Sequence, residues 1–255
     1  MASYGASLAW ARGLEWPGQL SNATGFAVLG ESDRWHFVLL FSAILSSVYW
    51  SCVAFFMGCD YFGLLSRYRI NANDGTYPSR AAIREALVDA VVGQLLVRPA
   101  LLFVFFPVFV RLLGMGAGSG EMPGAWTVAW QFLACMQVDD FLFYWSHRLL
   151  HHRLIYKHIH KKHHDFRHSI AIGVEHAHPI EDLVSNTLST IAGPLLLRSH
   201  VTVLFLYTGA KLWQSIDAHS GYDLPFPLSP WSAIKYMDCA PAHDFHHSHN
   251  HGNCE

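Results

Sequence analysis

FVLLFSAILSSVYWSCVAFFM, residues 37–57, contains no charged residue in 21 positions. A helix needs about 20 apolar residues to cross the roughly 30 Å hydrocarbon core of a membrane, so this segment predicts a transmembrane helix. It begins too far from Met1 for a signal peptide and lacks the basic flank and cleavage site of one. The chain is therefore predicted to be an integral membrane protein.

Three further apolar segments follow, at residues 90–110, 126–145 and 184–212. Arg98-Pro99 interrupts the first of them, and Gly193-Pro194 interrupts the last. Backbone breaks at membrane depth are tolerated only where protein or water satisfies the freed polar groups. We therefore expect these two segments to form helical hairpins or kinked spans. The predicted fold is an all-α integral membrane bundle of about four spans or hairpins with a histidine-rich, metal-binding cap on the cytosolic side.

The composition supports a membrane protein and excludes other classes. Charged residues make up 14% of the chain, whereas soluble domains carry about a quarter. The formal net charge of −2 gives no electrostatic footprint for nucleic acid, so no nucleic-acid partner is expected. The five cysteines form no CxxC pair, which indicates reduced thiols. No linker or repeat divides the chain, so we expect an N-terminal segment, 1–36, followed by one membrane domain, 37–255.

Basic residues follow the first and the third apolar segments. They are Arg67, Arg69, Arg80 and Arg84 after the first, and Arg148, Arg153, Lys157, Lys161, Lys162 and Arg167 after the third. The positive-inside rule places both stretches in the cytosol. Segment 1–36, with a glycosylation sequon at 22–24, and the glycine-rich stretch 114–124 would then be luminal.

Fifteen of the eighteen histidines fall between residues 147 and 178 or between 243 and 251. They form three short patterns, HRLLH at 147–151, HKKHH at 160–164 and HDFHH at 243–247. On a helix, residues three and four apart share a face, so each pattern can present its histidines together. Neutral imidazole is the commonest side-chain ligand for transition metals. The eight histidines exceed the four to six donors of one ion, which predicts two metal ions.

Simpler interpretations compete with a metal centre. A histidine-rich tract can be a solvated face beside the membrane, and membrane metal transporters also carry such loops. Transporters usually place polar residues at the bilayer midplane between inverted repeats, and this chain shows neither feature. The other histidines are expected to be surface groups (His152, His158, His168, His249 and His251) or interfacial or core residues (His36 and His200).

The three patterns resemble the histidine boxes HxxxH, HxxHH and HxxHH of the fatty acid hydroxylase/sterol desaturase superfamily. DDFLFYWSHRLLHH, 139–152, is similar to the family's entry to the first box. EHAHPIE, 175–181, resembles the segment after box two in the C4-methylsterol oxidase branch, and IDAHSGYDLP, 216–225, resembles a segment of that branch and of cholesterol 25-hydroxylase. The resemblance covers the chain from about residue 37 onward.

The resemblance implies a set of site residues. Eight box histidines would be metal ligands, and two more histidines occupy positions where the family has further histidines. The ten are His147, His151, His160, His163, His164, His178, His219, His243, His246 and His247. Asp140 lies seven residues before His147, so we expect it to accept a hydrogen bond from a ligand imidazole and support catalysis. Asp165 and Asp244 are adjacent acids that could act in the same way.

The resemblance also implies an activity. Members of the superfamily are endoplasmic reticulum membrane enzymes with a non-haem di-iron centre that uses O2. The expected reaction is hydroxylation or oxidation of a C–H bond of a sterol or related lipid, most like C4-methylsterol oxidation. A fatty acid hydroxylase or a sterol desaturase is the alternative. The chain has neither a dinucleotide-binding GxGxxG nor the HPGG of a fused cytochrome b5 domain. Electrons would therefore come from NAD(P)H through a separate cytochrome b5 and its reductase, which places the active site on the cytosolic face.

Overall fold

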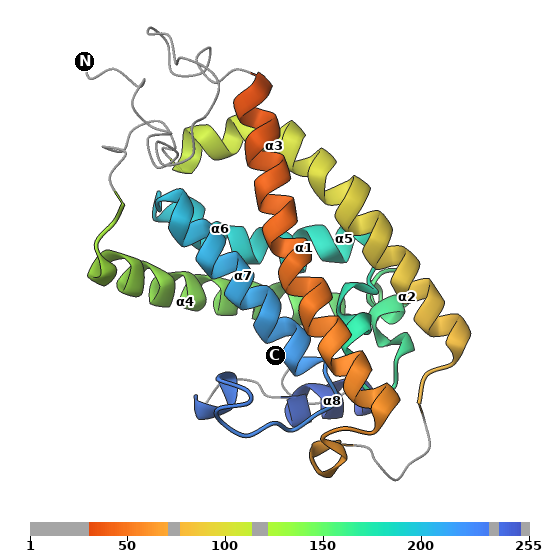
Figure 1. Ribbon diagram of the computed structural model, residues 1–255. Helices are drawn as coiled ribbons and strands as arrows, with labels where there is room; N and C mark the ends of the chain where they lie inside the picture. Colours follow the sequence, from red (N-terminus) through yellow and green to blue (C-terminus); the bar gives the residue numbers. More distant parts are fainter. Residues whose placement is uncertain (1–30, 71–76, 114–121, 235–239, 251–255) are drawn as a thin grey trace, which may run out of the picture.

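The computed structural model describes residues 31–70, 77–113, 122–234 and 240–250, and within these residues it is all-helical (Figure 1). The all-α class predicted from the sequence is confirmed for this part of the chain. The sequon at 22–24, most of the glycine-rich stretch 114–124 and His251 lie outside the described residues.

The first apolar segment is the long helix α1, Glu31–Phe62. Its buried side chains recur mainly at every fourth position, at Phe37, Phe41, Leu45, Tyr49 and Val53. This spacing gives one packed face. Other apolar side chains on the helix remain exposed, which suits a helix with one side against protein and the other against lipid.

The second apolar segment is one continuous helix rather than a hairpin. It consists of α2, Arg80–Val92, a π-helical turn η4, Gly93–Val97, and α3, Arg98–Leu113. Pro99 has no backbone N–H and would clash with the carbonyl one turn earlier in a regular α-helix. The wider π turn lies just before it, and such turns commonly absorb this kind of irregularity.

The third apolar segment lies within α4, Ala125–Leu150, which has 26 residues. Its buried residues follow an i, i+4 series that begins at Gln131, Cys135 and Asp139 and reaches His147. This series winds around the helix, because four residues exceed one turn by about 40°. The helix therefore carries its buried face from its apolar start to the histidines at its end.

The fourth apolar segment is a helical hairpin, as predicted, but its turn lies later than expected. A short α5, Pro179–Glu181, continues through a π-helical η7, Asp182–Thr187, into α6, Leu188–Leu196. The chain turns after Leu196 and enters α7, Val201–Ala218. Gly193-Pro194 lies inside α6, where a Cβ on Gly193 would stand 2.7 Å from Cα of Cys135 in α4. The glycine thus serves close α4–α6 packing and does not break the helix.

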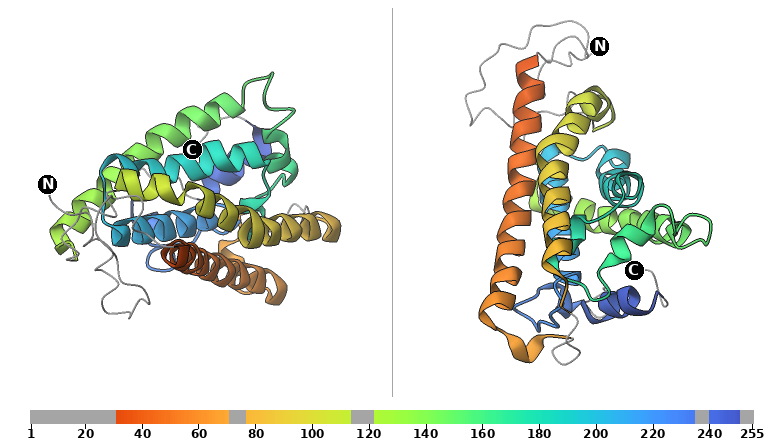
Figure 2. Two further views of the ribbon diagram at one scale, coloured as in Figure 1. Left: turned by 90° about the horizontal axis from the view of Figure 1, so that it is seen from above. Right: turned by 90° about the vertical axis from the view of Figure 1, so that its right-hand side faces the viewer.

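The short histidine-bearing helices gather at one end of the long helices. Helix α1 packs beside α3 and α7, and α4 packs along α6 (Figures 1 and 2). The short helices η5, His160–Asp165, and α8, Ala240–His249, lie near the end where α1 finishes and α2 begins. The segments η3, Ser66–Tyr68, η6, Ala171–Glu175, and η8, Trp231–Ala233, complete the described helices.

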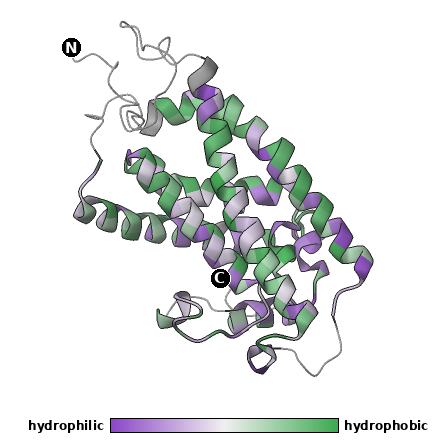
Figure 3. Ribbon diagram, viewed as in Figure 1, coloured by the Kyte–Doolittle hydropathy of each residue, from purple (hydrophilic) through white to green (hydrophobic). Residues whose placement is uncertain are grey.

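Two helices in the described residues are long and apolar enough to cross a membrane, Arg34–Phe62 and Arg80–Val110. Figure 3 shows hydrophobic residues along most of α1 and α3. The sequence predicted about four spans or hairpins, so the structure supports two of them as spans. Helix α4 carries Asp139 and Asp140, and α7 carries Lys211 and Asp217, which lowers the mean hydropathy of both.

Candidate metal centre

Four segments bring nine histidines together inside the protein. The last two turns of α4 and the residue that ends it provide His147 and His151, and η5 provides the second box. His219 ends α7, and α8 provides the third box. The nine imidazoles fall into two groups, which we call the five-histidine group (His147, His151, His160, His164 and His246) and the four-histidine group (His163, His219, His243 and His247).

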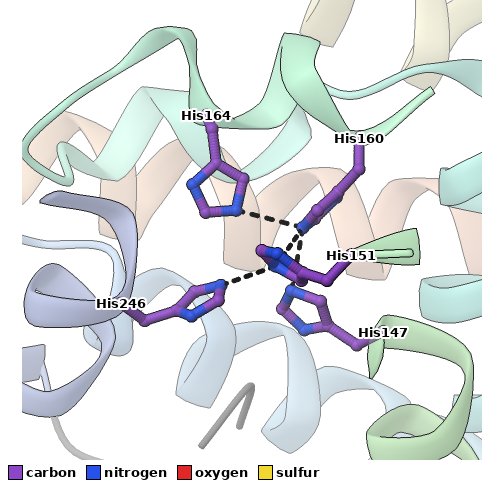
Figure 4. Close-up of side chains that lie close together, drawn as sticks. All are labelled: His147, His151, His160, His164 and His246. Atoms are coloured by element: carbon purple, nitrogen blue, oxygen red, sulfur yellow. Dashed lines mark hydrogen bonds between the residues drawn. The ribbon is translucent and has the colours of Figure 1, made fainter. Parts of the chain in front are cut away.

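In the five-histidine group the Nε2 atoms converge on one another (Figure 4). Nε2 of His160 lies 2.9 Å from Nε2 of His151. It also lies 3.0 Å from the same atom of His147 and of His164. Nε2 of His246 completes the group at 3.0 Å from His151. The imidazoles thus point their ligating atoms at a common centre.

In the four-histidine group the ligating atoms also lie close to one another, and all four residues are buried. Nε2 of His219 lies 2.9 Å from that of His243 and 3.2 Å from that of His163. Nε2 of His247 lies 3.1 Å from that of His243. The boxes are shared between the groups, because His163 lies between two members of the other group in the sequence. His246 similarly lies between His243 and His247.

Burial keeps these imidazoles neutral. Desolvation lowers the pKa of His151, His219 and His246 to about 4, that of His164 to about 3 and that of His160 to about 2. Desolvation, reinforced by the neighbouring imidazoles, lowers the pKa of His147, His163, His243 and His247 well below 6.5. A metal binds the neutral form of histidine, so at neutral pH all nine side chains are in the ligating form.

The donor arrangement fits metal ions better than it fits a hydrogen-bond network. A neutral imidazole Nε2 either donates one hydrogen bond or accepts with one lone pair. Nε2 of His160 nevertheless lies within 3.0 Å of three others, so direct hydrogen bonds cannot satisfy all of these contacts. With metal–nitrogen bonds of about 2.1 Å, ligands at right angles stand about 3.0 Å apart, which is the spacing seen in both groups. Among the described residues no thiolate or carboxylate joins either group, and an all-imidazole set suits iron, zinc or copper.

Contacts behind the ligating atoms orient several of the rings. Nδ1 of His219 is 2.7 Å from the carbonyl oxygen of Ser215, and Nδ1 of His247 is 3.3 Å from that of Phe166. An Nδ1–H directed to a carbonyl leaves the lone pair of Nε2 for the metal. Nδ1 of His160 lies 2.9 Å from Oε1 of Glu181, whose carboxyl group is buried. Burial raises the pKa of Glu181 to about 9, and the neighbouring Asp182 adds to this shift.

The structure places the remaining candidate residues away from the two groups. His178 caps α5, where its Nδ1 accepts a hydrogen bond of 3.2 Å from the backbone N–H of Ile180. Asp140 lies on the exposed side of α4, whereas its neighbour Asp139 is 1% exposed. Asp165 is also exposed. Oδ1 of Asp244 is buried and accepts a hydrogen bond from the backbone N–H of Ser169. The roles predicted for His178 and Asp140 stay predictions.

Glu181 is the functional candidate that sequence reasoning missed. It ends the EHAHPIE segment that carried part of the family resemblance, yet it lies 21 positions after its partner His160 in the sequence. The remaining histidines agree with expectation in part. His152, His158 and His249 are exposed, His200 caps α7, and His168 is half-buried at 3.2 Å from Asp244.

Comparisons with known proteins agree with the family resemblance of the three histidine boxes. The fatty acid hydroxylase family model matches residues 132–254, which include all three boxes. A putative methylsterol monooxygenase of Dictyostelium discoideum is 32% identical over 202 residues, covering 78% of this chain and 72% of the relative. Methylsterol monooxygenase 1 of Rattus norvegicus is 42% identical over 133 residues, 52% of this chain and 44% of the relative. A fatty acid hydroxylase of Mycosarcoma maydis is 33% identical over 186 residues, 73% of this chain and 45% of the relative. No solved structure matches the chain.

Proposed function

The chain belongs to the fatty acid hydroxylase family, an iron-dependent family of oxidoreductases, and we propose that it uses two iron ions and O2 to oxidise a C–H bond of a sterol. The observation that carries this proposal is the pair of buried imidazole groups with Nε2 atoms about 3 Å apart. The five-histidine group and the four-histidine group would each hold one ion. Bound iron would supply the binding and reduction of O2 and the oxidation of the C–H bond.

The residues of the chain prepare the site for this chemistry. Phe143 stands edge-on to His147 with ring centroids 5.0 Å apart, and Val174 lines the same small cavity as His163. These apolar side chains keep water from the centre, so that an oxidant formed there meets substrate first. The backbone carbonyls of Ser215 and Phe166 hold two imidazoles in orientation, and Glu181 contacts a third.

The relatives support a sterol as the substrate. Two of the three similar proteins named above are methylsterol monooxygenases, and one of them is matched over most of its length. We therefore propose oxidation of a C4-methyl group in sterol biosynthesis. A fatty acyl chain is the second candidate, favoured by the similarity to a fatty acid hydroxylase.

The electron supply and location follow from the same proposal. A separate cytochrome b5 and its reductase would deliver electrons from NAD(P)H at the cytosolic face of the endoplasmic reticulum. Arg153 and Lys157 are exposed between boxes one and two, and Lys161 is exposed within box two, where they would attract an acidic partner. The proposal thus includes a multi-pass protein whose histidine-bearing end faces the cytosol.

Sterol profiling tests the activity directly. The chain would be expressed in a host that lacks its own C4-methylsterol oxidase, beside a His164→Ala variant with one ligand removed. We expect the wild-type chain to deplete the accumulated 4-methylsterols and the variant to leave them unchanged. Unchanged sterols with hydroxylated fatty acids would favour the second candidate. Protein purified without chelator should contain about two iron ions per chain, and a folded, active, metal-free preparation would contradict the proposal.

A further inference from the structure

A small cavity lies between the two histidine groups. His147 of the five-histidine group and three members of the four-histidine group line it, and its volume is about 20 Å³. A cavity needs at least about 10–15 Å³ of this kind to hold one water molecule. The cavity therefore accepts one group of the size of a water oxygen, such as a hydroxyl, directly beside both groups.

Glu181 contributes a carboxyl group to this cavity with one oxygen still unused. Its Oε1 lies 2.9 Å from Nδ1 of His160, while Oε2 is buried and has no hydrogen-bond partner within the described residues. A buried polar atom left unpaired destabilises the folded protein. Such an atom on a side chain that lines a water-sized cavity suits a polar group bound in that cavity.

The π-helical turn η7 brings a second polar side chain to the same wall. A π-helix closes its hydrogen bonds between residues five apart, so residues at that spacing lie on one face. Asn186 follows Glu181 by five residues, and both line the cavity. Between them, the hydroxyl of Ser185 is occupied at 2.9 Å from that of Ser146. Asn186, which carries an amide, and Glu181, which carries a carboxyl group, thus both belong to the lining of the same small space.

We propose that Glu181 and Asn186 bind a hydroxyl group of the substrate next to the carbon that is oxidised. This inference rests on the proposed function and adds the residues that select the substrate. A hydroxyl both donates and accepts a hydrogen bond, which matches a carboxyl and an amide group together. The cavity has room for the hydroxyl group alone, so the carbon that is oxidised would lie outside it, next to the apolar Phe143 and Val174 of its lining. Within this site, Glu181 and Asn186 are positioning residues for the substrate.

A competition between two substrates tests the inference. Iron-loaded protein would be given equal amounts of 4,4-dimethylcholestanol and the same hydrocarbon without its hydroxyl group, and the ratio of oxidised products would be measured. The wild-type protein should prefer the alcohol. One hydrogen bond to a neutral group contributes about 0.5–1.5 kcal/mol, or roughly 2- to 13-fold. Asn186→Leu and Glu181→Gln should each reduce the preference by a factor in that range.

Metal content is measured in parallel and separates the possible outcomes. Within the described residues the Asn186 side chain makes no hydrogen bond to a histidine, so Asn186→Leu should keep the iron content of the wild type and lose only the preference. Glu85→Gln, an exposed carboxylate on α2, is the control and should change neither value. An unchanged preference in iron-loaded Asn186→Leu would overturn the inference even if Glu181→Gln lost iron. A wild-type protein that oxidises neither of the two compounds would instead refute the proposed function.

Discussion

The hydroxyl of Tyr207 on α7 donates a hydrogen bond of 2.8 Å to Oδ2 of Asp139 on α4. The same oxygen lies 3.1 Å from Nζ of Lys211, so the buried carboxylate of Asp139 has both a cation and a hydrogen-bond donor beside it. A buried charge of this kind is stable only when it is paired and hydrogen-bonded. This contact joins two helices that end at the histidine groups, at His151 and His219.

Neighbouring aspartates should therefore differ sharply in their effect on stability. Tyr207→Phe removes one hydrogen bond to a buried charge and should lower the free energy of unfolding by about 1–3 kcal/mol. Asp140→Asn changes an exposed side chain and should stay within about 0.5 kcal/mol. Thermal unfolding of the detergent-solubilised protein provides the measurement. A larger loss for Asp140→Asn than for Tyr207→Phe would show that the wrong acid was assigned to the interior.

Substitution inside and outside the five-histidine group should separate ligands from surface histidines. His164→Ala removes one Nε2 from the convergent set and should reduce the bound metal by about one ion per chain. His152→Ala lies only twelve residues earlier, is exposed, and should retain both metal content and activity. Elemental analysis of both purified variants gives the comparison. Equal metal content in the two would mean that the convergence of imidazoles does not represent a metal site.

His219 and His178 form a second informative pair, because the family resemblance implied both as additional ligands. His219→Ala should weaken metal binding at the four-histidine group, because it removes one of four buried donors. His178→Ala should keep its metal and lose about 0.5–2 kcal/mol of stability, as expected for loss of a helix cap. Metal titration against a competing chelator measures the first effect and thermal unfolding the second. Metal loss in His178→Ala would place that histidine among the ligands.

The metal-free protein should become less stable as the pH falls below 6.5. Burial depresses the pKa of the nine histidines in the folded state, to about 4 for His151, His219 and His246. Between pH 6.5 and 4 the unfolded chain therefore binds more protons than the folded chain, so acid favours unfolding. Unfolding of apoprotein followed from pH 7.5 to pH 5 should show a falling midpoint. A midpoint that rises over this range would contradict the assigned burial.

The membrane orientation can be tested with inserted tags. The basic residues after the first and third apolar segments predict a cytosolic histidine-bearing end and a luminal N-terminus. In sealed microsomes, protease should remove a tag inserted at Arg167 and spare a tag at the N-terminus. The opposite pattern would refute the charge argument and would separate the site from a cytosolic electron donor.

Local sequence patterns predicted much of the fold, because helix formation and burial follow the order of apolar residues. The span at 37–57 and the helical hairpin near 184–212 are examples. Which of the two aspartates on α4 is buried required tertiary information, and the catalytic role predicted for Asp140 stays a prediction. A spacing of seven residues from His147 favoured Asp140, but the buried face of α4 follows a four-residue series that winds around the helix. The direction of such a face depends on the angle at which α4 crosses α6 and α7, and sequence spacing does not contain that angle.

The histidine boxes were visible in the sequence, but their division into two groups was not. Helical spacing grouped His160, His163 and His164 together, whereas the structure directs the middle one away from the other two. Segment η5 is a 3₁₀ helix, in which residues three apart are eclipsed, so its own geometry would keep His163 beside His160. The division therefore depends on how the other histidine-bearing segments are placed around η5. Glu181 was missed because its contact with His160 joins two segments that only the fold brings together.

The sharing of boxes two and three between the groups has a consequence for the order of metal loading. A first ion in the five-histidine group would immobilise η5 and α8, and these segments also carry His163, His243 and His247. Binding of the first ion then carries the loss of conformational entropy for both segments, and binding of the second ion does not. Loading should therefore be cooperative, with the second ion bound more tightly than the first, so that half-loaded protein is scarce during a titration.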